Sequence, residues 1–335
     1  MDELTYDDIK AATDRIAGHV RPVAVAPLDT GEIRTGHRGP RHSHEWGEPT
    51  PCHVWLALEY LQHTGSFKAR GAQNFIRAHR EAGALPDVGV AIASGGNAGL
   101  ACAWAAQQQN VRATVFLPAT APPVKVARLR GYGVDVRLVG AEYAEAAAAC
   151  EEFAATSGAL TSHAYNHPLI AAGAGTLVEE LRERIPDLDT VVVAVGGGGL
   201  FAGVATAARH HGVRVVAVEP ENCRALNAAL EAGTLVDVPV DSVAADSLGA
   251  RRASAMALSA AQQENVVSVL VSDTDIVQAR QALWDHHRVA VEHGAATALA
   301  ALTSLNRVYV PVSGEKVAVV LSGANTDVRT LAADV

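Results

Sequence analysis

The sequence contains no run of about 18 apolar residues, which is the length that a helix needs to cross a membrane. Its first residues, Met1-Asp2-Glu3-Leu4, are acidic, whereas a secretory signal peptide begins with basic residues and continues with an apolar segment. These two absences predict a soluble cytoplasmic protein with no membrane partner.

Positive charge is also scarce. The chain has 27 lysines and arginines against 36 aspartates and glutamates, which gives a formal net charge of −9. Nucleic acids and anionic membranes are bound by surfaces with an excess of positive charge. We therefore expect no nucleic-acid partner.

Closely spaced cysteines are missing as well. The four cysteines, Cys52, Cys102, Cys150 and Cys223, are scattered and never form a C-x-x-C spacing. That spacing is the usual sign of a thiol-bound zinc ion or a redox-active pair. Isolated cysteines of this kind are typical of structural thiols in a reducing cytosol.

What the sequence does contain is an alternation of apolar, β-branched runs with alanine-rich helical patterns. The runs that read as strands are Val54–Leu58, Val88–Ala93, Ala113–Leu117, Asp135–Leu138, Thr190–Val195, Val213–Val218, Val266–Val271 and Lys316–Leu321. The helical patterns are Asn97–Gln109, Val124–Arg130, Tyr143–Ala155, Ala171–Arg184, Leu200–His210, Thr274–His287 and Ala295–Leu305. Such alternation predicts an α/β fold with parallel sheets covered by helices. Ligands of these folds bind at the carboxyl ends of strands, so the loops after Ala93, Val195 and Leu321 should carry the chemistry.

One segment departs from the alternation. Thr30–Cys52 is polar, with three prolines and the histidines His37, His42 and His44. The histidine spacing matches no zinc-ligand pattern. We expect a surface loop there and no metal site.

The first chemically suggestive loop is Thr64–Ala72, which reads TGSFKARGA. Ser66 is a plausible N-cap for a helix that follows. Lys68 would then lie in the first turn, where the positive end of the helix dipole disfavours an ammonium group. A lysine with a lowered pKa is what a Schiff-base nucleophile requires.

The second loop is Ser94–Gly99, which reads SGGNAG between a predicted strand and a predicted helix. Glycines let backbone N–H groups converge, and a helix start favours an anion such as a substrate carboxylate. The same letters also fit an ordinary glycine turn capped by Asn97.

The third loop is Gly196–Leu200, which reads GGGGL after a predicted buried strand. Four glycines cost chain entropy, and they are typical of backbone that wraps a phosphate. Gly197, Gly199 and Ala202 form a G-x-G-x-x-A pattern that starts in this loop. The acid Glu219 follows about 20 residues further on, which is the spacing of a dinucleotide fingerprint. A nicotinamide-dependent oxidoreductase is therefore a serious rival at this point.

The fourth loop is Ser322–Asn325, at the end of a predicted buried strand. Its serine is either a helix cap or a hydroxyl that faces the same edge of the sheet as the glycine loop. A dinucleotide fold explains one of the four loops, whereas a Schiff-base cofactor explains all of them. They would supply the amine, the carboxylate nest, the phosphate cradle and a partner for the cofactor's ring nitrogen.

In order and separation, the four loops resemble those of fold-type-II pyridoxal-phosphate enzymes, and most closely the serine/threonine dehydratase family. The similarity includes Val218-Glu219-Pro220 and Val291-Glu292. It implies a tryptophan-synthase-β-like fold of two domains, with parallel-rich twisted sheets flanked by helices. Residues 1–87 and 166–335 would form the large cofactor domain. Residues 88–165 would form a smaller inserted domain that closes over the substrate.

The resemblance also implies a role for each loop. Lys68 would bind pyridoxal phosphate as a Schiff base, with Phe67 beside its ring. Asn97 would bond the phenolic oxygen and Ser322 the pyridine nitrogen. The implied phosphate ligands are Gly196, Gly197, Gly198, Gly199 and Leu200. The residues implied to bind the substrate's carboxylate group are Ser94, Gly95, Gly96, Asn97 and Ala98.

The activity implied by the resemblance is β-elimination of a β-hydroxy amino acid such as L-serine or L-threonine, giving a 2-keto acid and ammonia. A neutral Ser322 would not keep the ring nitrogen protonated, which favours direct loss of the β-hydroxyl. Alternatives are a β-replacement synthase, the oxidoreductase, and a cofactor-binding protein without catalysis. The family resemblance also suggests a homodimer.

Two positions depart from the patterns of relatives. Gly95 stands where racemising relatives carry a serine that acts as a second base, so racemisation is not expected. Ala225 stands where some relatives carry an aspartate that helps to bind a divalent cation. A divalent-metal site built on Glu219 is therefore not expected, and a monovalent cation is left as an alternative.

Overall fold

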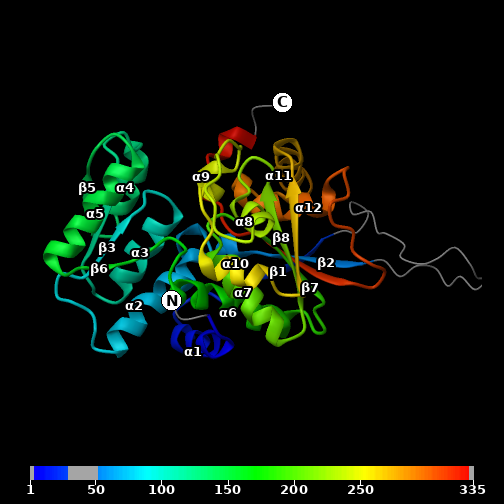
Figure 1. The fold of residues 1–335 in the computed structure, drawn as a ribbon, viewed down its shortest axis with the longest axis horizontal. Helices are drawn as coiled ribbons and strands as arrows, with labels where there is room; N and C mark the ends of the chain where they lie inside the picture. The colour runs from blue at the N-terminus through cyan, green and yellow to red at the C-terminus, as the bar shows by residue number, and fades with distance from the viewer. Residues whose placement is uncertain (1–3, 29–51, 332–335) are drawn as a thin grey trace, which may run out of the picture.

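The computed structural model describes residues 4–28 and 52–331, and it arranges them in two lobes that are each built on one sheet (Figure 1). The larger sheet has six strands in the order β1-β2-β10-β7-β8-β9. These are β1 Val25–Leu28, β2 His53–Ala57, β7 Thr190–Ala194, β8 Arg214–Pro220, β9 Val266–Val271 and β10 Lys316–Val320. Only the β1–β2 pair is antiparallel.

The smaller sheet has four parallel strands in the order β5-β4-β3-β6. They are β3 Val90–Ala93, β4 Ala113–Leu117, β5 Asp135–Leu138 and β6 Leu160–Thr161. Both sheets are flanked by helices, so the predicted α/β fold of parallel-rich sheets is confirmed. The predicted domain boundaries at residues 88 and 165 stay a prediction.

The helices and short 3-10 turns connect these strands. The α-helices are α1 Tyr6–Ile16, α2 Lys68–Glu81, α3 Asn97–Gln108, α4 Pro123–Arg130, α5 Tyr143–Ser157, α6 Pro168–Arg184, α7 Gly199–His210, α8 Ala225–Ala232, α9 Ala245–Leu248, α10 Ala255–Ala261, α11 Asp273–His287 and α12 His293–Thr303. The 3-10 turns are η2 Glu59–Leu61, η3 His63–Gly65 and η4 Val328–Leu331. Among the described residues, none of these helices has the length and apolarity needed to cross a membrane.

The central strand β7 shows how the larger lobe is packed. Val191 and Val193 face a core that α1, α6 and α7 cover, while Val192 and Ala194 face a second core under α11 and α12. All five residues of β7 are buried. A strand covered on both faces has apolar residues at successive positions, which is why this run was recognisable in the sequence.

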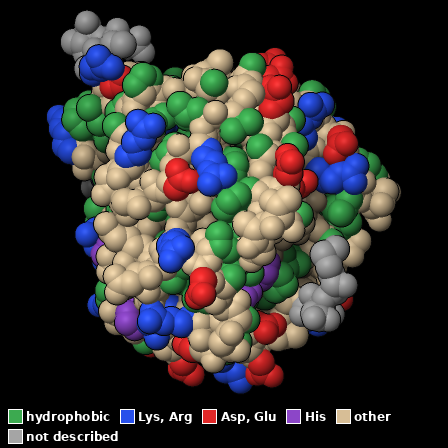
Figure 2. All heavy atoms as spheres, turned by 90° about the vertical axis from the view of Figure 1, so that its left-hand side faces the viewer, with side chains coloured by type: hydrophobic (Ala, Val, Ile, Leu, Met, Phe, Trp, Pro, Cys, Tyr) green, Lys and Arg blue, Asp and Glu red, His purple; other side chains and the backbone are tan. Residues whose placement is uncertain are grey.

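The smaller lobe repeats this arrangement on a reduced scale. In β4, Val115 and Leu117 pack toward α2 and α3, and Phe116 packs toward α5. Figure 2 views the molecule from the side of this lobe and shows lysines, arginines and acids interspersed over the surface, without a large patch of one sign.

Several elements were not predicted. Helix α1 begins with a capping box, in which Thr5 Oγ1 accepts from the Asp8 N–H and Asp8 accepts from the Thr5 N–H. This T-x-x-D signal was present in the sequence. Strands β1 and β6 and helices α8 to α10 are short, and short elements leave a weak periodic signal. The predicted surface loop over Thr30–Cys52 lies, apart from Cys52, outside the described residues.

Candidate active site

Lys68 is the first residue of helix α2, which packs against α3 of the smaller lobe and α6 of the larger one. The cap residue is Phe67, whose side chain makes no capping bond. The prediction that Ser66 is the N-cap is therefore wrong. Ser66 is extended instead, because it pairs with Gly323 in an isolated antiparallel bridge.

The Lys68 amine lies in an enclosed place. Its Nζ donates to the Ala164 carbonyl at 3.2 Å and sits 4.5 Å from the centre of the Phe67 ring. Burial lowers the pKa of Lys68 from 10.5 to about 8, although the negative charge of Glu292 acts in the opposite direction. An amine with such a pKa is partly neutral near pH 8, as a nucleophile or proton acceptor must be.

The Ser322 loop lies directly against the Lys68 segment. The Phe67 N–H donates to the Ser322 carbonyl at 3.0 Å, and the Ala324 N–H donates to the Gly65 carbonyl at 2.9 Å. Two loops that are about 250 residues apart in the sequence are thus joined because β2 and β10 are parallel neighbours. Within the described chain, the half-buried Ser322 hydroxyl has no protein hydrogen-bond partner.

Asn97 comes from the smaller lobe and meets the same loop. It is the first residue of α3, whose cap is Gly96, so the alternative reading of Asn97 as a helix cap does not hold. Its Nδ2 donates to both Glu292 oxygens at 2.9 and 3.0 Å, and its Oδ1 accepts from Asn325 at 2.6 Å. The amide assigned above to the cofactor is therefore bonded to protein at both ends in this structure.

The loop Ser94–Ala98 forms a tight turn before α3. The Ser94 hydroxyl accepts weakly from the Gly96 N–H at 3.4 Å. A Cβ on Gly99 would lie 1.9 Å from the Ser94 carbonyl oxygen, so only glycine allows the helix to start this close to the loop. The N-terminus of α3 meets the larger lobe through the bonds of Asn97 to Glu292, and a helix start can bind an anion.

The glycine loop Gly196–Gly199 leads from β7 into α7. Gly198 has a φ of +95°, which glycine adopts without strain. A Cβ on Gly197 would lie 2.4 Å from the Tyr165 ring, so this backbone is in close contact with the loop that also receives the Lys68 amine.

A phosphate fits the backbone groups of this loop. In the described chain, the amide N–H groups of Gly196–Gly199 donate to no protein acceptor. Converging free amides at a helix N-terminus are what a phosphate group requires. Together with the enclosed Lys68 amine and the unpartnered Ser322 hydroxyl, they form a set of groups that suits pyridoxal phosphate.

Glu219 does not serve the rival interpretation. It is fully buried within β8, and its carboxylate accepts from the N–H groups of Leu226 and Asn227 at 2.8 and 2.7 Å. Burial raises the pKa of Glu219 to about 7, and these two hydrogen bonds oppose the shift. A carboxylate used to cap α8 is inaccessible to a ribose hydroxyl, so the dinucleotide fingerprint loses its acid.

Within residues 4–28 and 52–331, no group of three or more histidine, cysteine or acidic side chains is placed to hold a metal ion. The four cysteines are all buried and free, which agrees with their interpretation as structural thiols.

Two parts of the site were missed in the sequence. The segment His163–Asn166 supplies the carbonyl that accepts from Lys68 and the ring that covers Gly197. Glu292 was noted only as part of a matching motif, yet it bonds Asn97 and the Asn325 N–H. The available signal in the sequence was a lone acid directly before the apolar pattern of α12. Glu292 is only 7% exposed in the structure, and a buried acid requires hydrogen-bond partners.

Comparison with known proteins points the same way. A family model described as pyridoxal-phosphate dependent enzyme matches residues 37–323. An L-threonine ammonia-lyase of Geobacter sulfurreducens is 37% identical over 331 residues, which cover 98% of this chain and 77% of the relative. A serine dehydratase-like protein of Homo sapiens is 38% identical over 283 residues, covering 81% of this chain and 85% of the relative.

Solved structures give a similar picture. A maize serine racemase superimposes with a TM-score of 0.86 at 28% identity, covering 98% of this chain and 96% of that one. The processed form of a threonine deaminase from Solanum lycopersicum superimposes with a TM-score of 0.83 at 25% identity, covering 99% of this chain and 94% of that one.

Proposed function

Because the chain belongs to the family of pyridoxal-phosphate-dependent enzymes, we propose that it converts a β-hydroxy amino acid such as L-serine or L-threonine to a 2-keto acid and ammonia. The observation that carries this proposal is the enclosed Lys68 amine, with a pKa of about 8, against the Ser322 loop. The relatives named L-threonine ammonia-lyase and serine dehydratase-like support the same activity.

Each loop has a part in holding the cofactor. When bound, pyridoxal phosphate supplies an electron sink for the bond that breaks at the substrate's α-carbon. The amides of Gly196–Gly199 and the start of α7 at Leu200 would bind its phosphate. Phe67 would lie beside its ring. Ser322 would donate to its ring nitrogen, and Asn97 to its phenolic oxygen.

The protein's own groups then handle the proton and the substrate. Backbone amides of Ser94–Ala98 at the start of α3 would bind the substrate carboxylate. The Lys68 amine would take the proton from the α-carbon. Its pKa of about 8 suits this task, because a general base works best with a pKa close to the working pH.

Ser322 would favour elimination by its lack of charge. A neighbouring carboxylate would stabilise a proton on a ring nitrogen, whereas a neutral hydroxyl does not. Ser322→Ala is expected to weaken pyridoxal phosphate binding, and Ser322→Asp to slow elimination and increase transamination. Unchanged binding and product ratios in both variants would reduce Ser322 to a structural residue.

Racemisation is the reaction that the geometry disfavours, although a serine racemase has a similar structure. Gly95 offers no side chain for a second base. A Cβ at this position would lie 2.4 Å from Leu117 Cδ2, so a buried methyl group fills that space. A proton therefore has no evident donor on the face opposite Lys68.

A direct test is to incubate the purified protein with L-serine and L-threonine and to separate keto acids and enantiomers by chromatography. Keto acid is expected in large excess over the D-amino acid. D-serine formed at a comparable rate, or no turnover of either substrate, would overturn the proposal. Added sulfide distinguishes the alternative β-replacement synthase, which would make the thiol product in place of keto acid.

We also propose that residues 88–165 form a domain that closes over the substrate. Two contacts between the lobes support this: Arg128 of α4 donates to Asn325 Oδ1 at 2.8 Å, and Lys125 of α4 pairs with Asp246 at 3.2 Å. Small-angle scattering should detect a more compact particle when L-serine is added. The same overall dimensions with and without substrate would contradict closure.

The oligomeric state, the cellular location and the cation requirement of the protein are proposed by analogy with the family. We propose a homodimer in the cytoplasm, with a monovalent cation held near Glu219. Light scattering should give the mass of two chains, and activity should depend on potassium when tetramethylammonium replaces it. A monomer, or equal activity in both salts, would contradict the corresponding part.

A further inference from the structure

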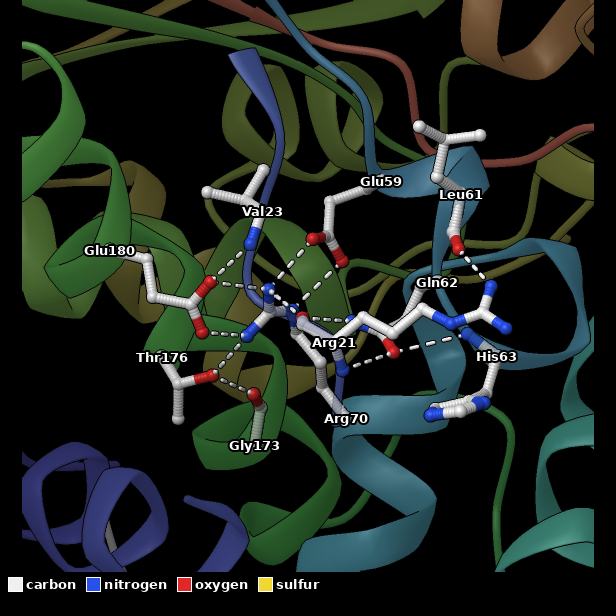
Figure 3. A network of polar contacts seen from close by, with 10 residues as sticks. All are labelled: Arg21, Val23, Glu59, Leu61, Gln62, His63, Arg70, Gly173, Thr176 and Glu180. Carbon is white, nitrogen blue, oxygen red and sulfur yellow. Dashed lines mark hydrogen bonds and ion pairs between the residues drawn. The ribbon is translucent and has the colours of Figure 1, made fainter. Parts of the chain in front are cut away.

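Arg70 is a fully buried cation two residues after Lys68, with carboxylates on both sides (Figure 3). Its Nε and Nη2 donate to the two oxygens of Glu59 at 2.8 and 2.7 Å. Its Nη1 and Nη2 donate to the two oxygens of Glu180 at 2.6 and 2.9 Å. Two-pronged contacts of this kind use the planar fork of a guanidinium, which lysine cannot reproduce.

These contacts join segments that are distant in the sequence. Glu59 belongs to η2, and Glu180 belongs to α6. Glu180 Oε2 also accepts from the Val23 N–H at 2.6 Å, and Arg70 Nη2 lies 3.5 Å from the Arg21 carbonyl (Figure 3). Arg70 therefore ties the first turn of α2 to a 3-10 turn, a long helix and the segment that precedes β1.

The backbone around Arg70 has no room to shift toward α6. A Cβ on Gly71 would lie 2.6 Å from the Ile170 carbonyl oxygen, and one on Gly173 would lie 2.7 Å from the Arg70 carbonyl oxygen. The two helices are thus in backbone contact at the turn that carries Arg70. Guanidinium and backbone contact together fix the place and the direction of this turn.

Stability alone is a poor explanation for such a network. Burying charges costs free energy that their attraction only partly returns, and apolar residues of similar volume often stabilise a protein equally well. What a two-pronged pair supplies in addition is a defined geometry. The residue whose geometry depends most directly on this turn is Lys68, at its first position.

We propose that Arg70 is a positioning residue for the reaction, which fixes the first turn of α2 and so keeps the Lys68 amine enclosed between the Phe67 ring and the Ala164 carbonyl. This role rests on the proposed attachment of the cofactor to Lys68, but not on the choice between elimination and replacement.

The proposal has a measurable consequence for acidity. Burial is the main cause of the lowered pKa of Lys68, and the charged or titratable groups that act on it are Glu292, which raises it, and His163, whose own pKa is lowered by burial and by Lys68. If the turn loosens, water reaches the amine while these two groups remain. The pKa of Lys68 should then rise from about 8 toward 10.5.

The experiment uses the full chain, freed of cofactor, with pyridoxal phosphate as the probe. Its covalent yield on Lys68 is trapped with borohydride at a series of pH values and measured by peptide mass. The yield is taken at a fixed short time, before equilibrium is reached. Because only a neutral amine attacks the aldehyde, the midpoint of this yield against pH reports the pKa of Lys68. The variants are Arg70→Lys, which keeps the charge, and Glu180→Gln. The matched control is Arg80→Lys in the last turn of α2, where Arg80 bonds Gln109.

In Arg70→Lys the midpoint should rise by about one pH unit or more, a tenfold change in the neutral fraction at fixed pH. Arg80→Lys should leave it in place. Glu180→Gln should raise it by less. Removal of a negative charge would by itself lower the pKa of an amine, so a rise in this variant can come only from movement of the turn.

An Arg70→Lys protein that folds and keeps the wild-type midpoint overturns the proposal. If Arg70→Lys does not fold, Glu180→Gln decides, and an unchanged or lowered midpoint in that variant overturns it. Faster hydrogen exchange in the peptide around Lys68, alongside a raised midpoint, supports it. A wild-type label on a lysine other than Lys68 would instead refute the attachment proposed above.

Discussion

Lys68 and Arg70 are two cations on the same turn of one helix, and the protein treats them in opposite ways. Lys68 has a backbone carbonyl at 3.2 Å and, among the described residues, no carboxylate within ion-pair distance. Burial lowers its pKa to about 8. Burial acts on Arg70 in the same direction, but Glu59 and Glu180 offset it, so the pKa of Arg70 is raised. Burial therefore leaves the pKa of a cation lowered where no carboxylate is bonded to it, and at Lys68 the charge of Glu292 offsets only part of the shift.

The largest effect on activity should come from removing Lys68, the cation without a bonded carboxylate. Lys68→Ala takes away the amine that binds the cofactor and accepts the proton, so elimination should fall by at least ~10²- to 10⁴-fold, the usual contribution of a general base. The measurement is keto-acid formation with saturating pyridoxal phosphate. Lys316→Ala is the control, because Lys316 begins β10 at the end far from Ser322 and bonds the Pro186 carbonyl. Equal activity of Lys68→Ala and wild type would remove Lys68 from the chemistry.

Removing Arg70, the cation paired with Glu59 and Glu180, should instead lower the free energy of unfolding. Arg70→Met leaves Glu59 buried without a partner, and breaking a buried pair in this way costs about 3–5 kcal/mol. Urea denaturation of the cofactor-free protein measures this loss. The double variant Arg70→Met, Glu59→Gln should recover part of the stability, because the orphaned negative charge is gone. A loss below about 1 kcal/mol in the single variant would show that the network is not tightly held.

The pH dependence of stability sharpens the comparison. Lys68 has a lower pKa in the folded protein than in the unfolded chain, so between about pH 8 and 10.5 the unfolded chain binds more protons. Its contribution to the free energy of unfolding therefore increases with pH in that window, by at most about 1.36 kcal/mol per pH unit. Lys68→Met should remove this increase in the cofactor-free protein. Identical slopes for variant and wild type would mean that the Lys68 pKa is not lowered.

The smallest effect concerns Ser66, whose hydroxyl is buried and, in the described chain, has no partner. A buried hydroxyl without a partner costs free energy, so Ser66→Ala should leave the stability of the cofactor-free protein unchanged or raise it by up to about 1 kcal/mol. Thr176→Val is the contrasting control, since Thr176 Oγ1 accepts from Arg70 at 3.2 Å. A Ser66→Ala protein that loses more stability than Thr176→Val would show that the Ser66 hydroxyl is satisfied.

Much of the fold could be predicted from the sequence, because most strands are apolar runs such as β4 and β7, while β5 alternates polar and apolar residues. Ala113–Leu117, Asp135–Leu138 and Val266–Val271 were predicted with the bounds that the structure gives. The turn chemistry was harder. Ser66 has the residue type of a cap, yet its bridge to Gly323 keeps it extended, and no local pattern predicts a partner about 250 residues away.

The site was predictable as loops but not as contacts. Lys68, Gly196–Gly199 and Ser322 lie in loops or turns that follow strands of the larger sheet, and Asn97 follows β3 of the smaller sheet, so strand ends indicated where these residues lie. The Arg70 network could not be foreseen, because a lone arginine in a helical pattern is usually exposed. Its partners lie on η2 and α6. Such pairings depend on how helices pack, which residue periodicity alone does not encode.

The most direct test of the central claim is the identity of the lysine that holds the cofactor. The holoenzyme is reduced with borohydride and digested, and the labelled peptide is located by mass. The chain has only three other lysines, Lys10, Lys125 and Lys316, so the result is unambiguous. The account predicts a single label on Lys68. A label on Lys125 or Lys316, or no covalent label at all, would contradict it.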